Sequence, residues 1–261
     1  MSEAVGEAGG KTRDTDQMGG FAKGLAVIEA FGEGRSSLTI ADVARIAGLD
    51  RATARRCLLT LVKAGYATSD GRQFELTPRI LRLGHTFLAA SLPRLIQSTL
   101  DQLADSVQES CSASVLDGSE VVYIARAAQH RLMGVGLHPG SRLPAYCTSM
   151  GRVLLAALPP DHSRKLLLST ERPALTNHTV TDVDELMKEL AKVRAQGYSL
   201  IDQEVEIGSR SIAVPVQNIA GRTVAAINIG AHVTRATMDR IMDDYLPNLF
   251  KAQDSLHKML P

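Results

Sequence analysis

The chain has 261 residues, which is longer than most single domains of about 100 to 200 residues and therefore predicts two domains. Apolar residues make up 44% and charged residues 22% of the chain, a balance typical of a folded globular protein rather than a disordered or fibrous one. The acidic, Gly-rich beginning and the lack of a long apolar run exclude a signal peptide and a membrane helix, so we expect a cytoplasmic protein with no membrane partner.

Three cysteines stand far apart in the sequence, at Cys57, Cys111 and Cys147. An odd number at wide spacing is typical of reduced thiols and fits neither a disulfide framework nor a zinc site, so we expect no metal and no cofactor. The net charge of +1 favours no particular partner, but residues 40–66 hold five basic and two acidic side chains. This modest basic patch indicates nucleic-acid binding only if the predicted fold places it on a surface that can contact nucleic acid.

The beginning of the chain predicts a flexible arm followed by a helix. Residues 1–19 are rich in Gly and in charged residues and cannot bury enough apolar surface to become ordered. From Phe21 onward, apolar residues recur at steps of three and four, at Phe21, Leu25, Ile28 and Phe31. They predict an amphipathic helix with these side chains on its apolar face, and Gly32 ends it.

The stretch "SLTIADVARIAGLD" predicts a second, short helix. Thr39 and Asp42 have the spacing of a capping box, and Gly48 ends the helix. Asp50 then caps a third helix over residues 51 to about 63, and Gly65 closes it. A helix, a tight Gly turn and a second helix form the layout of a helix-turn-helix.

The third predicted helix has two unlike faces. Its apolar face carries Ala54, Cys57, Leu58 and Leu61. Its other face is basic, and an arginine fork at the start of a recognition helix matches phosphate oxygens or the edge of guanine in the major groove. An ordinary solvated face is the alternative, but such a face more often mixes the two signs of charge. The residues expected to contact DNA here are Arg51, Ala52, Thr53, Arg55 and Arg56.

A hairpin follows the third helix in "YATSDGRQFELT". Tyr66 and Thr68 precede an Asp-Gly turn at residues 70–71, and Phe74 and Leu76 follow at alternate positions. This pattern predicts a wing, so residues 20–77 read as a winged helix-turn-helix. Arg72 lies at the tip of the wing, where it either contacts phosphate or the minor groove or is an ordinary surface arginine.

Residues 78–92 predict a linker helix that begins at Pro78. Its apolar stripe consists of Ile80, Leu83, Phe87 and Leu88, and Pro93 must kink or split the helix that continues beyond it. A stripe between two domains has little local core to cover it, so a dimer contact is the economical explanation. A two-fold dimer would present two recognition helices to a palindromic operator on double-stranded DNA.

Residues 93–261 predict a second domain in which strands and helices alternate. A hairpin turns at Asp117 and Gly118, a third strand falls in "MGVGLH" at residues 133–138, and later strands are expected over residues 198–201, 211–216 and 223–229. Helices are expected over residues 150–157, 161–168 and 183–195 and from Thr234 onward. Strands that run in hairpins predict an antiparallel sheet, and hence an α+β fold.

The stretch "LPAYCTSMGRVLLAAL", residues 143–158, carries two possible chemistries. Cys147 or Ser149 could be the nucleophile of a hydrolase or transferase, which is the alternative function. A nucleophile elbow needs Gly two residues before the Ser, however, and Cys147 stands there, with no base assignable from spacing. The other interpretation is a helix N-terminus whose free amides and dipole bind an anion. We expect no catalytic residue and no enzyme.

The whole chain resembles the IclR family of bacterial transcription regulators. The resemblance lies in the winged helix ending "LLTLVKAGY" and in "GSRLPAYCTSMGRVLLA", "LAKVRAQGYSLIDQEVEIGSRSIAVPV" and "GRTVAAINI". It implies a homodimer or a dimer of dimers, with a GAF-like domain that binds a small organic acid and a winged helix that acts on promoters. "LDGSEVVYIARA" and "LPAYCTSMGRVLLA" resemble the subgroup that controls catabolism of aromatic acids, which implies protocatechuate, 4-hydroxybenzoate or β-ketoadipate as effector.

The resemblance also implies which residues bind the effector. They are Ser149, Met150, Ile201 or Asp202, Ser211, Asn228 and Gly230, and the amides of residues 149–151 would add Gly151. Gly230 replaces a polar side chain of other family members, so the pocket either admits a bulkier ring or lacks one anchor. Arg142 and Arg210 either pair with a second carboxylate of the effector or form structural salt bridges.

Overall fold

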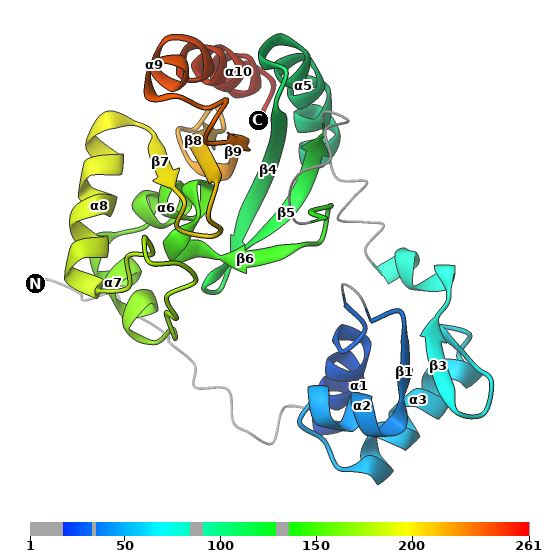
Figure 1. The fold of residues 1–261 in the computed structure, drawn as a ribbon. Helices are drawn as coiled ribbons and strands as arrows, with labels where there is room; N and C mark the ends of the chain where they lie inside the picture. Colours follow the sequence, from blue (N-terminus) through cyan, green and yellow to red (C-terminus); the bar gives the residue numbers. More distant parts are fainter. Residues whose placement is uncertain (1–17, 33–34, 84–90, 129–135, 261) are drawn as a thin grey trace, which may run out of the picture. The chain divides into compact units, whose positions relative to one another are not determined.

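The computed structural model describes residues 18–32, 35–83, 91–128 and 136–260 of the chain (Figure 1). The chain divides into two compact units, Met1–Thr86 and Phe87–Pro261. The expected flexible arm at residues 1–19 lies almost wholly outside the described residues, and the two units are taken in turn.

The helices of the first unit begin and end where their capping residues predict. They are α1 (Gly19–Glu29), α2 (Ile40–Ile46) and α3 (Arg51–Lys63). Thr39 and Asp42 form the predicted capping box, and the Asp50 carboxylate accepts a hydrogen bond from the amide of Thr53. Gly48 and Gly65, with φ of 63° and 78°, follow α2 and α3 in the left-handed conformation that Gly tolerates best.

The first unit also contains a small antiparallel sheet with strand order β1-β3-β2. Its strands are β1 (Ser37–Thr39), β2 (Ala67–Ser69) and β3 (Gln73–Leu76), and the last two form the predicted wing hairpin. The sequence did not predict β1, because three residues are too few to show alternation. Its Leu38 is buried with Leu58 of α3 and Phe74 of β3, so the wing is fastened to the helical core.

The expected apolar face of α1 is only partly correct. Val27 of α1 and its C-cap Ala30 are buried in the core of the unit, with the predicted Ile28 and Phe31 partly buried against it, whereas Phe21 and Leu25 are 67% and 43% exposed. The apolar stripe therefore predicts the helix correctly but is wider than the core that α2 and α3 provide.

After the wing, the expected linker helix starts differently. Pro78–Ile80 form a 3-10 turn, which Thr77 caps, and residues 81–83 are helical. Leu81 and Leu83 are exposed, while the predicted stripe residues Phe87 and Leu88 lie outside the described residues. The dimer contact expected here stays a prediction.

The second unit is built on an antiparallel sheet whose described strands have the order β6-β5-β4-β9-β8-β7. The strands are β4 (Ser110–Asp117), β5 (Glu120–Ala127), β6 (Arg142–Pro144), β7 (Ser199–Asp202), β8 (Ser209–Gln217) and β9 (Thr223–His232). Its α+β class and antiparallel pairing agree with the sequence-based prediction. In the described part of the chain, no helix combines the length and the apolar character needed to cross a membrane.

Helices cover both faces of this sheet (Figure 1). On one face lie α5 (Ser91–Val107), with Pro93 in its first turn, and α10 (Leu246–Met259). On the other face lie α6 (Ser149–Ala157) and α8 (Val183–Gln196), with α7 (Pro160–Leu168) packed beside α8. The helices predicted over residues 150–157, 161–168 and 183–195 are thus confirmed to within one residue at each end.

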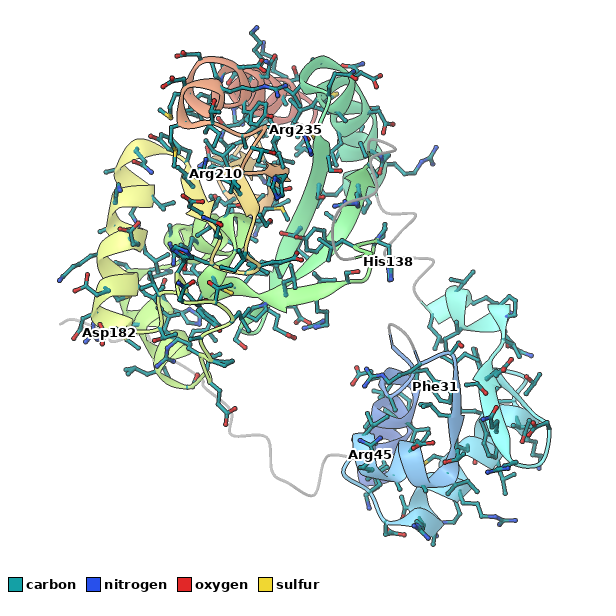
Figure 2. All side chains as sticks on the ribbon, in the orientation of Figure 1. Phe31, Arg45, His138, Asp182, Arg210 and Arg235 are labelled. Atoms are coloured by element: carbon teal, nitrogen blue, oxygen red, sulfur yellow. The ribbon has the colours of Figure 1, made fainter. Side chains whose placement is uncertain are left out.

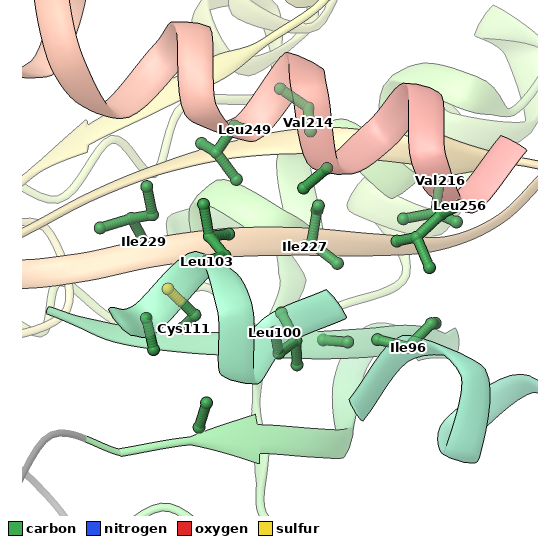
Figure 3. Close-up of a cluster of buried hydrophobic side chains, with 14 of the residues drawn as sticks. Ile96, Leu100, Leu103, Cys111, Val214, Val216, Ile227, Ile229, Leu249 and Leu256 are labelled. Carbon is green, nitrogen blue, oxygen red and sulfur yellow. The ribbon is translucent and has the colours of Figure 1, made fainter. Parts of the chain in front are cut away.

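Alternation along the central strands separates an apolar face of the sheet from a polar one. Cys111 of β4 and Ile227 and Ile229 of β9 pack with Leu100 of α5 and Leu249 of α10 (Figure 3). The alternate residues of β4 are serines, at positions 110, 112 and 114, and face the side of α6. The face of the sheet toward α6 therefore carries polar groups, whereas the face toward α5 and α10 belongs to an apolar core.

Two predictions about element boundaries were wrong. The third strand was expected at residues 133–138, but residues 136–138 are not in a strand and 133–135 lie outside the described residues, while β6 forms at Arg142–Pro144. The closing helix was expected from Thr234, but residues 233–235 form a turn and the helix starts at α9 (Met238–Arg240), capped by Thr237. It continues through a π-helical turn, η4 (Ile241–Tyr245), into α10.

Candidate nucleic-acid interface and effector pocket

The outer surface of α3 carries arginines that have no acidic partner in the part of the chain that the structure describes. Arg51, Arg55 and Arg56 are exposed, and none forms an ion pair with a described residue. Ala52 is exposed beside them, but Thr53 is only 7% exposed and sits under the helix start, where its Oγ1 accepts a hydrogen bond from Arg56 at 3.3 Å. A cluster of free guanidinium groups at the beginning of a helix can meet phosphates and base edges.

The wing presents one further exposed arginine, Arg72. The Asp70 carboxylate accepts hydrogen bonds from the amides of Arg72 and Gln73, at 2.8 and 2.7 Å, and these bonds hold the pKa of Asp70 below its ordinary value. Gly71 takes a φ of 95° in the same turn. The turn is thus held in one shape by local bonds, which leaves the Arg72 side chain free to contact a partner.

The polar face of the large sheet and the start of α6 enclose a pocket of about 210 Å³. Its polar wall includes Ser149 of α6, Ser211 of β8 and Asn228 of β9, and Leu143, Met150 and Val205 contribute apolar surface. A mostly apolar cavity with a few convergent polar groups is typical of a small-molecule site. Gly230 also lines this pocket, and a Cβ added there would meet no atom within 4 Å.

The first turn of α6 points its unbonded amides at this pocket. Thr148 is the N-cap, and its Oγ1 accepts a hydrogen bond from the amide of Gly151 at 3.2 Å. The amides of Ser149 and Met150 precede it and have no acceptor within the helix. The expectation of three free amides is therefore corrected to two. Gly151 is needed for another reason, since a Cβ there would lie 2.2 Å from the carbonyl oxygen of Ala145.

Several polar side chains of the wall have unused hydrogen-bonding capacity. The hydroxyls of Ser149 and Ser211 lie 2.9 Å apart and bond to each other, which leaves each able to bind a further group. Asn228 is 8% exposed, and its Oδ1 has no hydrogen-bond partner among the described residues. Burial raises the pKa of Tyr123 to about 12, so its hydroxyl keeps its proton near neutral pH. Buried polar groups of this kind cost free energy until a partner arrives.

Charged residues occur at one end of the pocket. Glu109 is buried and accepts two hydrogen bonds from Arg235, at 2.7 and 3.0 Å, while Arg126 donates to Ser112 Oγ at 3.1 Å. Figure 2 labels Arg235 and also Arg210, which binds Asp202 at 2.7 Å.

The structure brings most, but not all, of the predicted effector residues together. Ser149, Met150, Ser211, Asn228 and Gly230 line the pocket, whereas Gly151, Ile201 and Asp202 do not. Ile201 is buried in β7. The Arg210 guanidinium donates hydrogen bonds to the Asp202 carboxylate and holds the pKa of that carboxyl below its usual range. Arg142 pairs with Asp117 and Glu120 away from the pocket wall, so the salt-bridge alternative holds for both Arg142 and Arg210.

Sequence reasoning missed Tyr123, Arg126 and Glu109 as wall residues. The register of the sheet supplies the reason, because Ser112 of β4 lies opposite Arg126 of β5 on one side and Asn228 of β9 on the other. Alternation within β5 places Arg126 on one face, but nothing in the sequence tells which partner it faces.

Residues 143–158, which carry Cys147 and Ser149, contain no activated nucleophile. Burial raises the pKa of the Cys147 thiol to about 12, so the thiol is protonated at neutral pH and packs as an apolar group. Ser149 bonds to another serine, and no described histidine or carboxylate bonds to either residue. Neither side chain has the adjacent base that nucleophilic catalysis needs.

A buried ion pair connects α6 to the segment that follows β7. Arg152 Nη2 lies 2.7 Å from Glu204 Oε2, with the two side chains 3% and 8% exposed. Arg152 also donates to the carbonyl of Tyr146, and Glu204 accepts from the amide of Val180. Burial raises the pKa of Glu204, and the positive charge of Arg152 opposes that rise. Val205 follows Glu204 and lines the pocket, so this pair positions part of its wall.

A winged helix-turn-helix with a basic face, in one chain with a second unit that holds a pocket, is the organisation of a DNA-binding transcription regulator. Residues 21–71 match the IclR helix-turn-helix domain, and residues 87–257 match the family described as the bacterial transcriptional regulator IclR C-terminal domain. The chain belongs to the IclR family of bacterial transcription regulators.

Individual relatives support this membership over nearly the whole chain. The chain is 44% identical to the Pca regulon regulatory protein of Pseudomonas putida, over 95% of this chain and 86% of that protein. A crystal structure of a transcriptional regulator from Rhodococcus sp. RHA1 has 44% identity and a TM-score of 0.81, covering 94% of this chain and 98% of that one. An IclR homologue from Microbacterium hydrocarbonoxydans, solved with 4-hydroxybenzoate, has 26% identity and a TM-score of 0.79, covering 92% and 98%.

Proposed function

We propose that this regulator binds a small organic acid in the pocket beside α6, and that the acid changes its affinity for operator DNA at genes of aromatic-acid catabolism. The observation that carries the proposal is the buried Asn228 amide, whose Oδ1 has no partner among the described residues, in the same pocket as two helix amides with no acceptor in the helix. A carboxylate would accept from the two helix amides, and a hydrogen-bond donor elsewhere on the ligand or a water molecule would satisfy the acceptor Oδ1. The names of the relatives support the pathway, since one regulates the Pca regulon and another binds 4-hydroxybenzoate.

The acid would bind with a carboxylate at the start of α6. The amides of Ser149 and Met150 donate to it, together with whichever of the Ser149 and Ser211 hydroxyls is not donating to the other, and the dipole of α6 favours its negative charge. The apolar side chains of the wall cover the rest of the ligand, and Gly230 leaves room for a ring. Candidate effectors are protocatechuate, 4-hydroxybenzoate and β-ketoadipate.

DNA would meet α3 and the wing. Arg51, Arg55 and Arg56 supply the free guanidinium groups, Ala52 allows close approach, Thr53 orients Arg56, and Arg72 contacts phosphate. A homodimer, or a dimer of dimers, would present two such surfaces to a palindromic operator. The effector then acts by linkage, because it can shift DNA affinity only by its own difference in affinity for the two arrangements of the oligomer.

A melting screen of the full chain with the three candidate acids tests the proposal. An effector at about 100 times its Kd should add roughly 2.7 kcal/mol to the free energy of unfolding, which raises the melting temperature. Asn228→Leu should abolish this gain while leaving the unliganded protein as stable or more stable, because it removes a buried amide that lacks a partner.

Asn177→Leu is the matched control, since Asn177 is exposed and lies outside the pocket wall. It should keep the full ligand-induced shift. The proposal is contradicted if no acid of the panel raises the melting temperature of the unaltered protein.

A further inference from the structure

The wall of the pocket contains two carboxylates and two arginines, but they do not all pair with one another. The Glu109 carboxylate is occupied by Arg235, with Arg240 at 3.9 Å, and Glu206 is exposed at the rim. Arg126 has no counterpart of this kind. Its guanidinium forms no ion pair with any described residue and gives one hydrogen bond to Ser112 Oγ. Because a guanidinium carries five N–H donors, most of them remain for a ligand.

The strand register places this guanidinium inside the pocket. Arg126 of β5 and Asn228 of β9 both lie opposite Ser112 of β4, in a single row across the sheet. Directly opposed residues of antiparallel strands point to the same face. The bond to Ser112 draws the Arg126 side chain over β4, toward Asn228 and its unpartnered Oδ1.

The start of α6 packs over the same polar face of the sheet. Ser149 is bonded to Ser211 of β8, whereas Met150 Sδ accepts a hydrogen bond from Ser114 of β4 at 3.3 Å. Ser211 and Ser112, the residues that Ser149 and Arg126 contact, are on strands separated by β9 and so roughly 10 Å apart. The pocket wall thus has two positively polarised groups, the first turn of α6 at Ser149 and the Arg126 guanidinium, and Asn228 is on the strand between β8 and β4.

We propose that Arg126 binds a second acidic group of the effector, so that the pocket selects a small molecule with a carboxylate at each end. The inference rests on the proposed function, because it concerns the same pocket. A neutral hydroxyl at the far end accepts one hydrogen bond from the guanidinium but leaves its charge unpaired, whereas a second carboxylate pairs with it through two charge-assisted hydrogen bonds. Of the three candidate acids, β-ketoadipate has this character.

Calorimetric titration of the full chain with β-ketoadipate, adipate and 4-hydroxybenzoate tests this selectivity. The unaltered protein should bind the two dicarboxylates at least about tenfold more tightly than 4-hydroxybenzoate. Arg126→Met should weaken dicarboxylate binding by about 10- to 100-fold, and 4-hydroxybenzoate binding by less than about threefold. Arg126→Lys keeps the charge but loses the planar fork, so it should recover part of the loss.

Arg142→Met is the matched control, because Arg142 is on the adjacent strand β6 and its ion pairs lie outside the pocket wall. It should bind all three acids as the unaltered protein does. Tighter binding of 4-hydroxybenzoate than of the dicarboxylates overturns the inference, as does unchanged dicarboxylate affinity in Arg126→Met. Either result leaves the proposed function standing, since an acid still binds, whereas binding of no acid at all overturns both.

Should Arg126→Met fail to fold, the selectivity of the unaltered protein and the loss in Arg126→Lys decide the matter. Melting of each unliganded variant identifies such a failure. Arg126 makes no ion pair in the described chain, so we expect both variants to melt close to the unaltered protein.

Discussion

Arginine is used in opposite ways in the two units. On α3, Arg51, Arg55 and Arg56 are exposed and have no acidic partner among the described residues. In the second unit, ion pairs hold Arg142, Arg152, Arg164, Arg210, Arg235 and Arg240. Where the chain supplies the counter-charge, an arginine supports the fold. Where no described residue supplies it, the arginine is available to a partner, which we propose to be DNA for α3 and the effector for Arg126.

The largest effect is expected from removing two free arginines of α3. Arg55→Ala combined with Arg56→Ala should abolish operator binding at physiological salt, because each arginine fork on guanine contributes about 1–3 kcal/mol of discrimination. For the two arginines together this is about 2–6 kcal/mol, a loss of about 30-fold to 10,000-fold or more. Fluorescence anisotropy with operator DNA measures it, and the effector-induced melting shift should be unchanged.

A double variant of surface arginines in the second unit, Arg164→Ala with Arg222→Ala, controls for the loss of charge. It should bind the operator normally. If the α3 variant still gives a normal footprint, α3 does not read the DNA. A reduced slope of affinity against salt would assign the two arginines to phosphates rather than bases.

The second-largest effect is expected from breaking the buried pair. Arg152→Met leaves the Glu204 carboxylate buried with no counter-charge, which should lower the free energy of unfolding by about 3–5 kcal/mol. Urea denaturation measures this loss. A change below about 1 kcal/mol would show that water reaches the site and that this pair resembles an exposed one.

The loss in Arg152→Met should depend on pH in a defined direction. Burial already raises the pKa of Glu204, and removing Arg152 raises it further. A folded-state pKa above the unfolded one means that the folded protein binds more protons, so stability falls as pH rises through that interval. The difference from the unaltered protein should therefore narrow as the pH falls through the raised pKa of Glu204, where the carboxylate takes up a proton.

The smallest effect is expected at an exposed pair. Arg142 binds Asp117 and Glu120 at 2.8 and 2.7 Å, but all three side chains are more than 40% exposed. Water and salt screen such pairs, so Arg142→Met should cost no more than about 1 kcal/mol in urea denaturation. A loss as large as that of Arg152→Met would mean that burial does not explain the difference in stability expected between the buried and the exposed ion pairs.

Much of the first unit could be predicted from the sequence because its signals are local. Thr39, Asp42 and Asp50 cap helices through bonds to residues three positions away, and the Asp-Gly pair at residues 70–71 makes the wing turn. Exposure was less predictable. Thr53 was expected to contact DNA but is buried, and Phe21 and Leu25 are exposed although their spacing is that of an apolar face.

The effector pocket could be predicted only in part. Ser149, Met150, Ser211, Asn228 and Gly230 were expected and do line it, whereas Asp202 is held by Arg210, eight residues later in the chain. Nothing in the sequence indicated that Arg126 lies in the pocket. In our proposal it is Arg126, rather than Arg142 or Arg210, that binds a second carboxylate of the effector. An isolated arginine in a strand carries no local sign of the residues that lie opposite.

The sequence by itself determined the order of the elements, the capping of the helices, the apolar and basic faces of α3 and the antiparallel character of the sheet. Each of these depends on spacing within one element or between neighbours in the chain. The tertiary structure decided which polar groups share the pocket and which arginines have partners. Pairing of β4 with β9 joins residues more than one hundred positions apart, and together with the register of the β4–β5 hairpin it aligns Arg126, Ser112 and Asn228 in one row.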